Sequence, residues 1–273
     1  SIIADIHNAR YFTKLDLKSG YHQIPIHEQS RFLTVYAHLG ELWQFTRLQM
    51  GLSSAPSLFQ HQMLLIFRNH LGYTKIYLDD ILIYSDTLEE HLVHLEAVFK
   101  TCREYSIRLS ATKCEFAATK TVFLGHTISH RFVSNPPSYI DPIVDQPAPK
   151  DVSALRSFMG QLNFIAEHLH LIQWHLKPFH DLISEIAKVD KRKKAPIDWT
   201  PELRTLLTTL QTYIKTNYTP LMLPDVSRPF ELHTDASRIG CGGVLMQRHP
   251  STGVLHPVSF YSHLWHVPKS YAA

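Results

Sequence analysis

The amino-acid sequence predicts an α+β fold in which one sheet is backed by helices. Paired runs of β-branched and aromatic residues, separated by short polar turns, predict β-hairpins, and the clearest of these lies at residues 76–84. Segments with apolar residues at helical spacing flank this hairpin, at residues 56–66 and 88–102. Helices interleaved with hairpins are typical of a sheet covered by helices, which is an α+β arrangement.

The composition is that of a folded protein with room for two domains, or for one domain with appendages. Of the 273 residues, 44% are hydrophobic and 19% are charged, which is the usual balance of a folded chain. No apolar run reaches the roughly 20 residues that span a bilayer, and the start has no signal-peptide layout, so no membrane partner is expected. The net charge of +3 permits a polyanionic partner without requiring one.

The cysteines and histidines do not predict a metal site. Cys102, Cys114 and Cys241 are widely spaced, and we expect reduced thiols in an intracellular setting. The 19 histidines are scattered, and the closest pairs, at 91/94 and 168/170, have no carboxylate or cysteine partners arranged for a metal. We therefore expect surface or core histidines rather than a zinc site.

The first clear strand covers residues 11–17. Its alternation places Leu15 and Leu17 on one face, which we expect to be core, and Lys14 and Asp16 on the other. Asp16 is therefore a carboxylate on the polar face of a half-buried strand. Further expectations for this part of the chain are the end of a short helix within residues 1–10, extended structure at 21–26 and a hairpin at 34–45.

The hairpin at residues 76–84 carries two adjacent carboxylates, Asp79 and Asp80, at its bend. Its flanks are apolar, which predicts burial in a sheet. Two carboxylates there repel each other and lose solvation unless a cation offsets them, and hard divalent metals prefer oxygen ligands. Because an Asp–Asp pair is also common in solvated turns, the hairpin alone leaves both interpretations open.

The second half of the chain predicts helices followed by a new domain. The basic run at residues 191–194 is either a solvated linker or a phosphate contact. The expected elements are short strands at 107–109 and 121–128, mainly helix at 136–197, another helix after Trp199, and a hairpin that starts with a strand at 230–235.

Several short motifs, in this order and spacing, resemble those of a reverse transcriptase. The two main motifs are FTKLDLKSGYHQI at residues 12–24 and YLDDILIY at residues 77–84. Together the motifs cover essentially the whole chain and resemble the reverse transcriptase/ribonuclease H region of the Pol polyprotein of gypsy-type LTR retrotransposons. The supporting motifs are GLSSAP at 51–56 with Phe59-Gln60, KCEF at 113–116, FLGH at 123–126, LRSFMG at 155–160 and TDAS at 234–237.

The resemblance implies an RNA-directed DNA polymerase with a right-hand fold. It predicts a palm with partial fingers at residues 1–135, a helical thumb at 136–197 and the start of a ribonuclease H-like α/β domain at 198–273. The implied activity is template-directed nucleotidyl transfer with two Mg²⁺ ions, for which Mn²⁺ can substitute. The implied partners are an RNA or DNA template with its primer, dNTPs and other Gag and Pol products, and a homodimer is allowed. The implied location is cytoplasmic, in a virus-like particle.

The resemblance also implies roles for individual residues. Asp16 and Asp79 match the main metal ligands of the polymerase site, and Asp80 matches a third acid that contributes charge. Tyr21 matches an aromatic gate that excludes a ribose 2′-hydroxyl, although a half-buried strand aromatic remains the alternative. Asp235 matches the first carboxylate of a ribonuclease H metal site. The other matched residues are Met50 and Gly51, in the loop under the incoming base and template, and Phe123, Leu124, Gly125 and His126, in the hairpin that holds the primer end.

The chain also departs from the family pattern. It has Leu48-Gln49-Met50 where Met-Pro-Phe is usual, and residues 168–172 stand where aromatic and basic residues are usual. It starts shortly before Asp16 and stops before the next ribonuclease H acid is expected, which predicts a piece of a polyprotein or a decaying element. A catalytically silent nucleic-acid-binding relic is therefore the alternative. A two-metal nuclease is disfavoured, because it has no use for Tyr21 or the primer hairpin.

Overall fold

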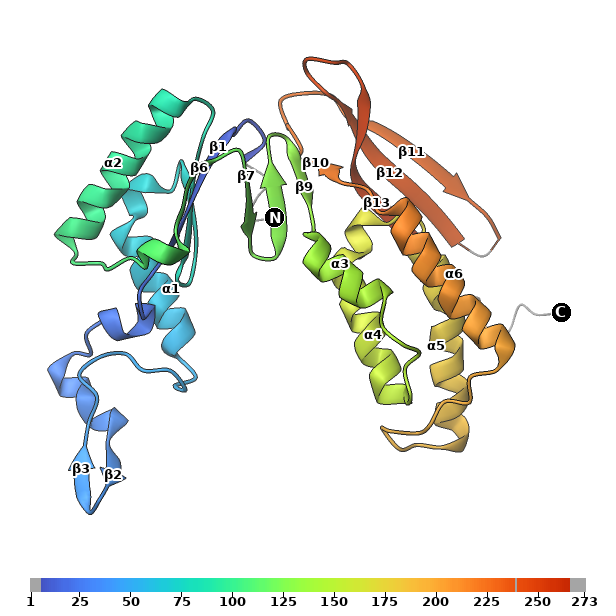
Figure 1. Cartoon of the computed structure of the whole chain (residues 1–273), viewed down its shortest axis with the longest axis horizontal. Coiled ribbons are helices and arrows are strands. Elements are labelled where there is room, and N and C mark those ends of the chain that lie inside the picture. The colour runs from blue at the N-terminus through green and yellow to red at the C-terminus, as the bar shows by residue number, and fades with distance from the viewer. Residues whose placement is uncertain (1–5, 239, 266–273) are drawn as a thin grey trace. The chain divides into compact units, whose positions relative to one another are not determined.

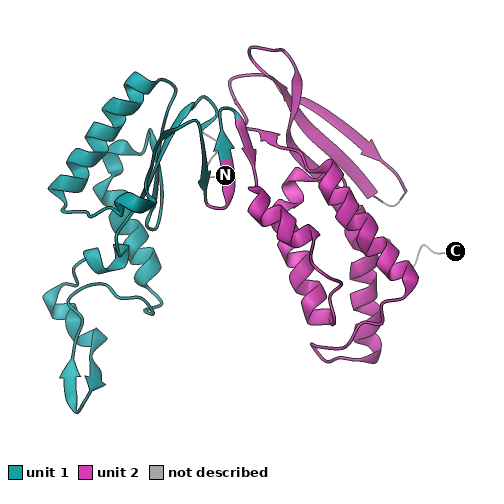
Figure 2. Cartoon of the chain, in the orientation of Figure 1, with its two compact units in different colours: residues 1–123, 128–131 teal, residues 124–127, 132–273 magenta. Residues whose placement is uncertain are grey.

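The computed structural model describes residues 6–238 and 240–265 and divides the chain into two compact units (Figure 2). Unit 1 comprises residues 1–123 and 128–131, and unit 2 comprises residues 124–127 and 132–273. Among the described residues, no helix is both long enough and apolar enough to cross a membrane.

Unit 1 is built on a four-stranded antiparallel sheet with the strand order β4-β5-β1-β6 (Figure 1). The two inner strands, β1 and β5, pair from Tyr11 opposite Ser85 to Asp16 opposite Asp80. The elements of unit 1 are β1 (Tyr11–Asp16), η2 (Gly20–Gln23), η3 (Glu28–Thr34), β2 (Tyr36–His38), β3 (Glu41–Trp43), α1 (Ala55–Ile66), η4 (Arg68–His70), β4 (Thr74–Tyr77), β5 (Asp80–Ser85), α2 (Leu88–Glu104), η5 (Ala111–Lys113), β6 (Glu115–Ala118) and β7 (Lys120–Phe123).

Helices α1 and α2 cover one face of this sheet and share a core with it (Figure 1). As strand alternation predicts, Leu15 faces this core while Lys14 and Asp16 point to the opposite face. That opposite face is less polar than the sequence predicts, because Phe12 and Leu82 lie on it and are fully buried. Buried members of the shared core are Leu15, Leu17, Leu48, Ala55, Phe59, Met63, Phe67, Ile76, Ile81, Ile83, Leu95, Val98 and Cys102.

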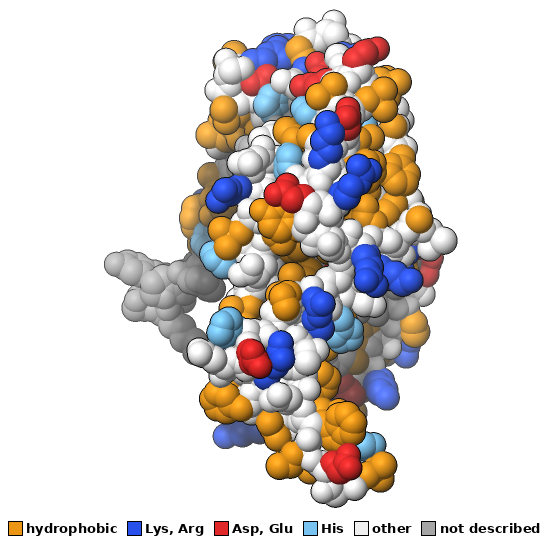
Figure 3. Space-filling model, turned by 90° about the vertical axis from the view of Figure 1, so that its left-hand side faces the viewer, with side chains coloured by type: hydrophobic (Ala, Val, Ile, Leu, Met, Phe, Trp, Pro, Cys, Tyr) orange, Lys and Arg blue, Asp and Glu red, His pale blue; other side chains and the backbone are white. Residues whose placement is uncertain are grey.

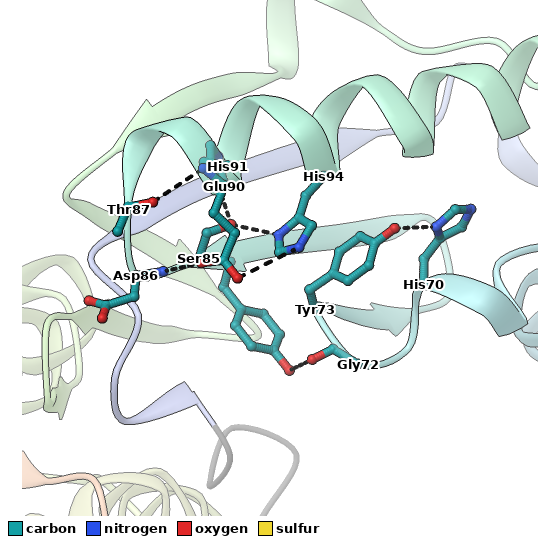
Figure 4. A network of polar contacts seen from close by, with 10 residues as sticks. His70, Gly72, Tyr73, Ser85, Asp86, Thr87, Glu90, His91 and His94 are labelled. Carbon is teal, nitrogen blue, oxygen red and sulfur yellow. Dashed lines mark hydrogen bonds and ion pairs between the residues drawn. The ribbon is translucent and has the colours of Figure 1, made fainter.

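Histidines fasten α2 to the end of β5 (Figure 4). The fully buried His91 places Nδ1 2.9 Å from the Ser85 hydroxyl and Nε2 2.8 Å from the Thr13 hydroxyl. His94 places Nδ1 2.8 Å from the same Ser85 hydroxyl and stacks on Tyr73, with ring centroids 3.7 Å apart. His91 is thus a core histidine, as one of the expected alternatives has it. The expectation that this pair lacks a carboxylate partner is wrong for His94, whose Nε2 lies 3.9 Å from Oε1 of Glu90.

Unit 2 combines a group of helices with a three-stranded antiparallel sheet of order β11-β12-β13. Helices α3 to α6 bury one common apolar core, and α5 also contacts β13 (Figure 1). Strand β8 (His126–Ser129) has residues in both units. The remaining elements are β9 (Phe132–Ser134), α3 (Pro137–Val144), α4 (Val152–Ile165), η6 (Ala166–His168), α5 (Ile172–Val189), α6 (Pro201–Asn217), β10 (Leu221–Met222), β11 (Glu231–Ala236), β12 (Gly240–Arg248) and β13 (Leu255–Leu264).

Most of the predicted elements form, with two exceptions. The short strand expected at 107–109 does not form, because in this stretch Leu109 makes only an isolated bridge with Leu17. The helical stretch at 136–197 and the hairpin that begins at 230 are both present. The prediction of extended structure at 21–26 is wrong at its start, because Gly20–Gln23 forms a 3-10 turn. Ser19, three residues after the end of β1, has a left-handed backbone with φ of 54° and precedes this turn. The helix end expected within residues 1–10 falls largely outside the described residues.

Candidate active site

Asp16 and Asp80 lie opposite each other on the face of the unit 1 sheet that α1 and α2 leave free. Asp16 is the last residue of β1 and Asp80 the first of β5, and the antiparallel register aligns them directly. Opposed Cα atoms in such a ladder are about 4.5–5.5 Å apart. Their side chains are 17% and 31% exposed, so both carboxylates are partly removed from water. The fold thus brings together two acids that are far apart in the sequence.

Asp79 lies in the tight turn between β4 and β5. Tyr77 pairs with Asp80, so the bend consists of Leu78 and Asp79, and Leu78 has a φ of 53°. The sequence prediction that both acids sit at the bend is therefore wrong by one residue. Asp79 is exposed at the bend, while Asp80 already belongs to the strand and is half-buried. The two neighbouring acids consequently have different environments.

Gln60 of α1 holds this turn in place. Its Oε1 accepts a hydrogen bond from the backbone N–H of Leu78 at 2.6 Å, and its Nε2 donates to the carbonyl of Ile76 at 3.0 Å. The backbone N–H of Leu17 donates to the carbonyl of Asp79 at 3.2 Å. The turn that carries Asp79 is therefore tied both to a core helix and to the end of β1.

The three aspartates concentrate negative charge that two lysines only partly offset. Partial burial raises the pKa of Asp80 above its ordinary value, Lys14 opposes that shift, and Asp79 and Asp16 raise it further. The Nζ atom of Lys14 lies 3.7 Å from Asp80 Oδ1, and that of Lys113 lies 3.5 Å from Asp16 Oδ1. A divalent cation relieves such repulsion and prefers carboxylate oxygens, so these residues fit a divalent metal site.

The aspartates are spread more widely than the ligands of a single ion. Within the part of the chain that the structure describes, they do not offer three ligand atoms that all lie within 4.8 Å of one another. A pair of ions about 4 Å apart needs a wider arrangement of ligands than one ion does. Among the described residues the three aspartates therefore do not form a compact site for one ion.

Tyr21 packs on helix α1 and follows Gly20, which lies close to the acidic turn. Its half-buried ring stacks on Phe59 of α1, with centroids 4.8 Å apart. A Cβ atom added to Gly20 would lie 3.0 Å from the Phe59 ring and 3.3 Å from Cβ of Asp79. A side chain at this position would therefore crowd Phe59 and Asp79, and glycine lets the backbone before Tyr21 approach both. An adjoining cavity of about 570 Å³ is lined by residues that include Gly20, Ile24 and Phe59.

The other predicted polymerase residues occupy two turns. Met50 is 72% exposed, and Gly51 has a φ of 96° that suits glycine. Between β7 and β8, Leu124 and Gly125 both have positive φ, at 51° and 78°, so they form a tight turn after the fully buried Phe123. The structure does not bring these residues into the contacts around the aspartates that are described above.

Asp235 is an exposed residue near the end of β11 in unit 2. Its Oδ1 accepts a hydrogen bond from the N–H of Ala236 at 2.9 Å. It lines a cavity of about 370 Å³ together with residues that include His170, Trp174 and His233. Among the described residues that line this cavity there is no second carboxylate, so a metal pair here would need further acids.

A second group of side chains that could hold a metal ion was missed by the sequence analysis. His126, Glu167 and His168 offer ligand atoms that all lie within 4.8 Å of one another. The expectation that the histidines lack a carboxylate partner is therefore wrong for His168, whose Nε2 lies 3.6 Å from Oε1 of Glu167. The adjacent Glu167 and His168 were a visible signal in the sequence, but only the fold brings His126 to them.

Charged side chains do not form one large patch of a single sign on the face shown in Figure 3. Lysine and arginine side chains there are interspersed with acidic and hydrophobic ones. In the basic run, Arg192 makes a close ion pair with Asp190, with 2.6 Å between Nη2 and Oδ2, which lowers the pKa of Asp190 to about 2. The charge on this face therefore does not by itself identify a polyanion-binding surface.

Two known protein families together match most of the chain. Residues 1–128 match the family described as "Reverse transcriptase (RNA-dependent DNA polymerase)". Residues 199–272 match the family described as "RNase H-like domain found in reverse transcriptase". The first match contains the three aspartates, and the second contains Asp235.

Curated relatives agree with these matches over nearly the full chain. The "Retrovirus-related Pol polyprotein from transposon 412" of Drosophila melanogaster is 33% identical, over 96% of this chain and 20% of its own length. The corresponding polyprotein from transposon gypsy of the same organism is 32% identical, over 90% of this chain and 24% of its own length. The chain thus spans about a fifth to a quarter of the length of these relatives.

Solved structures of a foamy viral protease-reverse transcriptase share the fold. One in complex with dsDNA has a TM-score of 0.83 and 25% identity, and the match covers 97% of this chain and 54% of that one. Another in complex with an RNA/DNA hybrid has a TM-score of 0.77 and 25% identity, covering 96% and 35%. The polymerase-type α+β fold that the sequence predicts is confirmed by this similarity.

The matches define residues 1–128 as a reverse transcriptase domain and residues 199–272 as a ribonuclease H-like domain. More particularly, the chain belongs with the corresponding region of retrotransposon Pol polyproteins such as those of transposons 412 and gypsy. The family resemblance that the motifs carry is thereby confirmed.

Proposed function

We propose that this chain is the core of an RNA-directed DNA polymerase from a retrotransposon Pol polyprotein. The observation that carries the proposal is the alignment of Asp16 with Asp80, with Asp79 in the adjoining turn, inside a reverse transcriptase domain. In this proposal residues 1–135 are a palm with partial fingers, residues 136–197 a helical thumb, and residues 198–273 a ribonuclease H-like domain.

Asp16 and Asp79 would be the main ligands of two divalent cations, and Asp80 would add negative charge. Mg²⁺, or Mn²⁺ in its place, would supply the positive charge that activates the primer 3′-hydroxyl and neutralises the triphosphate. The positive charges of Lys14 and Lys113 would partly neutralise Asp80 and Asp16 until the cations bind. The hydrogen bonds of Gln60 and Leu17 fix the backbone of the turn, so that Asp79 needs little rearrangement.

The residues around the acids would select and align the substrates. The ring of Tyr21, held by stacking on Phe59, would exclude a ribose 2′-hydroxyl. Met50 and Gly51 would lie under the incoming base and template. The turn at residues 123–126 would hold the primer end, and Asp235 would contribute to a ribonuclease H metal site.

The comparisons support nucleic-acid partners for this chain. The similar foamy viral enzyme has been solved with dsDNA and with an RNA/DNA hybrid, so we propose a primed RNA or DNA template and dNTPs as ligands. Other Gag and Pol products, a homodimer and a cytoplasmic virus-like particle belong to the same proposal, and they rest on the similarity to transposon polyproteins.

Primer extension tests the proposal against its alternatives. The purified chain is incubated with a labelled primer on an RNA template, dNTPs and Mg²⁺, beside a sample containing EDTA. Extension that depends on metal and dNTPs supports a polymerase. Binding of the primer–template without extension would favour a catalytically silent relic, and metal-dependent shortening of the primer without dNTP use would favour a nuclease.

Substitution of Tyr21 tests the sugar gate separately. Tyr21→Val removes the ring while leaving a β-branched side chain beside Phe59, so ribonucleotides should enter the site more readily. The measurement is the ratio of the extension efficiencies with a ribonucleotide and with the matching deoxyribonucleotide. A ratio equal to that of the parent chain would remove Tyr21 from this role.

A further inference from the structure

His126, Glu167 and His168 meet at one place within unit 2. His168 ends η6 directly after α4, Glu167 precedes it, and His126 is the first residue of β8. Their potential ligand atoms all lie within 4.8 Å of one another, and Nε2 of His168 is 3.6 Å from Oε1 of Glu167. Ligand atoms at 2.0–2.1 Å from a tetrahedral ion are about 3.3 Å apart, so small side-chain movements would close this arrangement around an ion.

His168 is held in the orientation that a metal ligand needs. It is fully buried, and its Nδ1 lies 3.1 Å from the carbonyl oxygen of Thr219. A carbonyl only accepts, so Nδ1 carries the proton and the neutral ring presents the lone pair of Nε2. The ring stacks on Tyr218 at 5.0 Å, and the Tyr218 hydroxyl donates to Asn135 Oδ1 at 3.0 Å. A bond from the other ring nitrogen to a carbonyl is the usual support of a metal-binding histidine.

His126 is also fixed by its surroundings. Its ring stacks on Phe164 of α4 with centroids 5.4 Å apart. A Cβ atom added to the preceding Gly125 would lie only 2.8 Å from the same Phe164 ring, so this turn packs tightly on α4. The packing leaves His126 little freedom, and it brings the ring to Glu167 and His168.

Both histidines keep a buried ring nitrogen that nothing satisfies. Nδ1 of His126 and Nε2 of His168 have no hydrogen-bond partner among the described residues. Leaving a buried polar atom unpaired is destabilising, so two such atoms beside one carboxylate need an explanation. The Glu167 side chain is 56% exposed, which gives the group access to solvent.

We propose that His126, Glu167 and His168 bind one divalent transition-metal ion, with Zn²⁺ as the best fit, and that this ion fastens the turn after β7 to the end of α4. Two imidazoles and one carboxylate are a common zinc ligand set, with water in the fourth position. Mg²⁺ is disfavoured, because it prefers oxygen ligands. This site is separate from the three aspartates and does not depend on the polymerase assignment.

Zinc titration of the full chain tests the site. Isothermal titration with Zn²⁺, in excess Mg²⁺ to occupy the aspartates, should show one tight site per chain, and Co²⁺ in its place should give the visible absorption of a four-coordinate ion. Glu167→Gln is the cleanest variant, because the side chain is exposed and its loss should not unfold the chain. We expect this change and His126→Gln each to weaken Zn²⁺ binding by roughly 100-fold.

Matched controls separate this site from other histidines. His170→Gln removes an exposed histidine two residues further along, and Glu185→Gln neutralises an exposed glutamate of α5. Both controls should bind Zn²⁺ as the parent chain does. If Glu167→Gln and His126→Gln retain the parent affinity and stoichiometry, or if the parent shows no tight site, the proposal is overturned and the pair Glu167–His168 is only an ion pair.

Discussion

Replacing Gln60 with leucine should loosen the turn that carries Asp79 without touching an acid. The substitution removes two hydrogen bonds of the Gln60 side chain. One is donated by the N–H of Leu78 to Oε1 at 2.6 Å, and the other is donated by Nε2 to the carbonyl of Ile76 at 3.0 Å. Each contributes about 1 kcal/mol net, so local opening of the hairpin should become easier by about 2 kcal/mol. That free energy corresponds to an approximately 30-fold change in an equilibrium constant.

Hydrogen exchange followed by mass spectrometry measures this opening directly. Peptides that cover residues 74–84 should exchange up to about 30-fold faster in Gln60→Leu, because exchange of protected amides follows the opening equilibrium. Gln62→Leu is the matched control, since Gln62 is a half-buried residue of the same helix. If the hairpin exchanges no faster in Gln60→Leu than in this control, Gln60 does not hold the turn.

Two further predictions concern buried titratable groups. Burial raises the pKa of the Cys102 thiol to about 11. At pH 8 Cys102 should therefore react with a thiol reagent much more slowly than the half-exposed Cys114. Equal reaction rates of the two thiols, measured by mass spectrometry, would contradict this. Burial also lowers the pKa of His91, so the unfolded chain takes up this proton more readily than the folded one. The stabilisation from neutral His91 should therefore be complete above about pH 6.5 and be lost as the pH falls below it. Urea unfolding at pH 7.5 and 5.0 should show a smaller loss of stability in His91→Gln than in the parent, and an equal loss would refute the assignment.

The sequence predicted the central strands well because their pattern is local. The alternation in residues 11–17 placed Asp16 opposite the core, and the apolar flanks of residues 76–84 predicted an inner strand. The bend was misplaced by one residue, because a positive φ at Leu78 has no signature in a leucine. The turn at Gly20–Gln23 was missed for a related reason, since its residues resemble a strand while Ser19 adopts a left-handed backbone.

The candidate sites depended on contacts that no local pattern encodes. The association of Asp16 with Asp79 was predicted from motifs that resemble a reverse transcriptase, not from the spacing of the acids, and the direct register of Asp16 opposite Asp80 was not predicted. The role of Gln60 could not be predicted, because its two partners belong to the backbone of another element. The group of His126, Glu167 and His168 was missed because a turn and a helix end that are distant in the sequence meet only in the fold.

The most direct test of the central claim compares aspartate variants in primer extension. Asp16→Asn and Asp79→Asn keep the side-chain shape but remove a negative charge, and Asp181→Asn is the control because Asp181 is an exposed residue of α5 that pairs with Lys177. We predict that both site variants bind the primer–template as the parent does but lose Mg²⁺-dependent extension, while the control extends normally. Extension at the parent rate by either Asp16→Asn or Asp79→Asn would contradict the claim that these aspartates hold the catalytic metals.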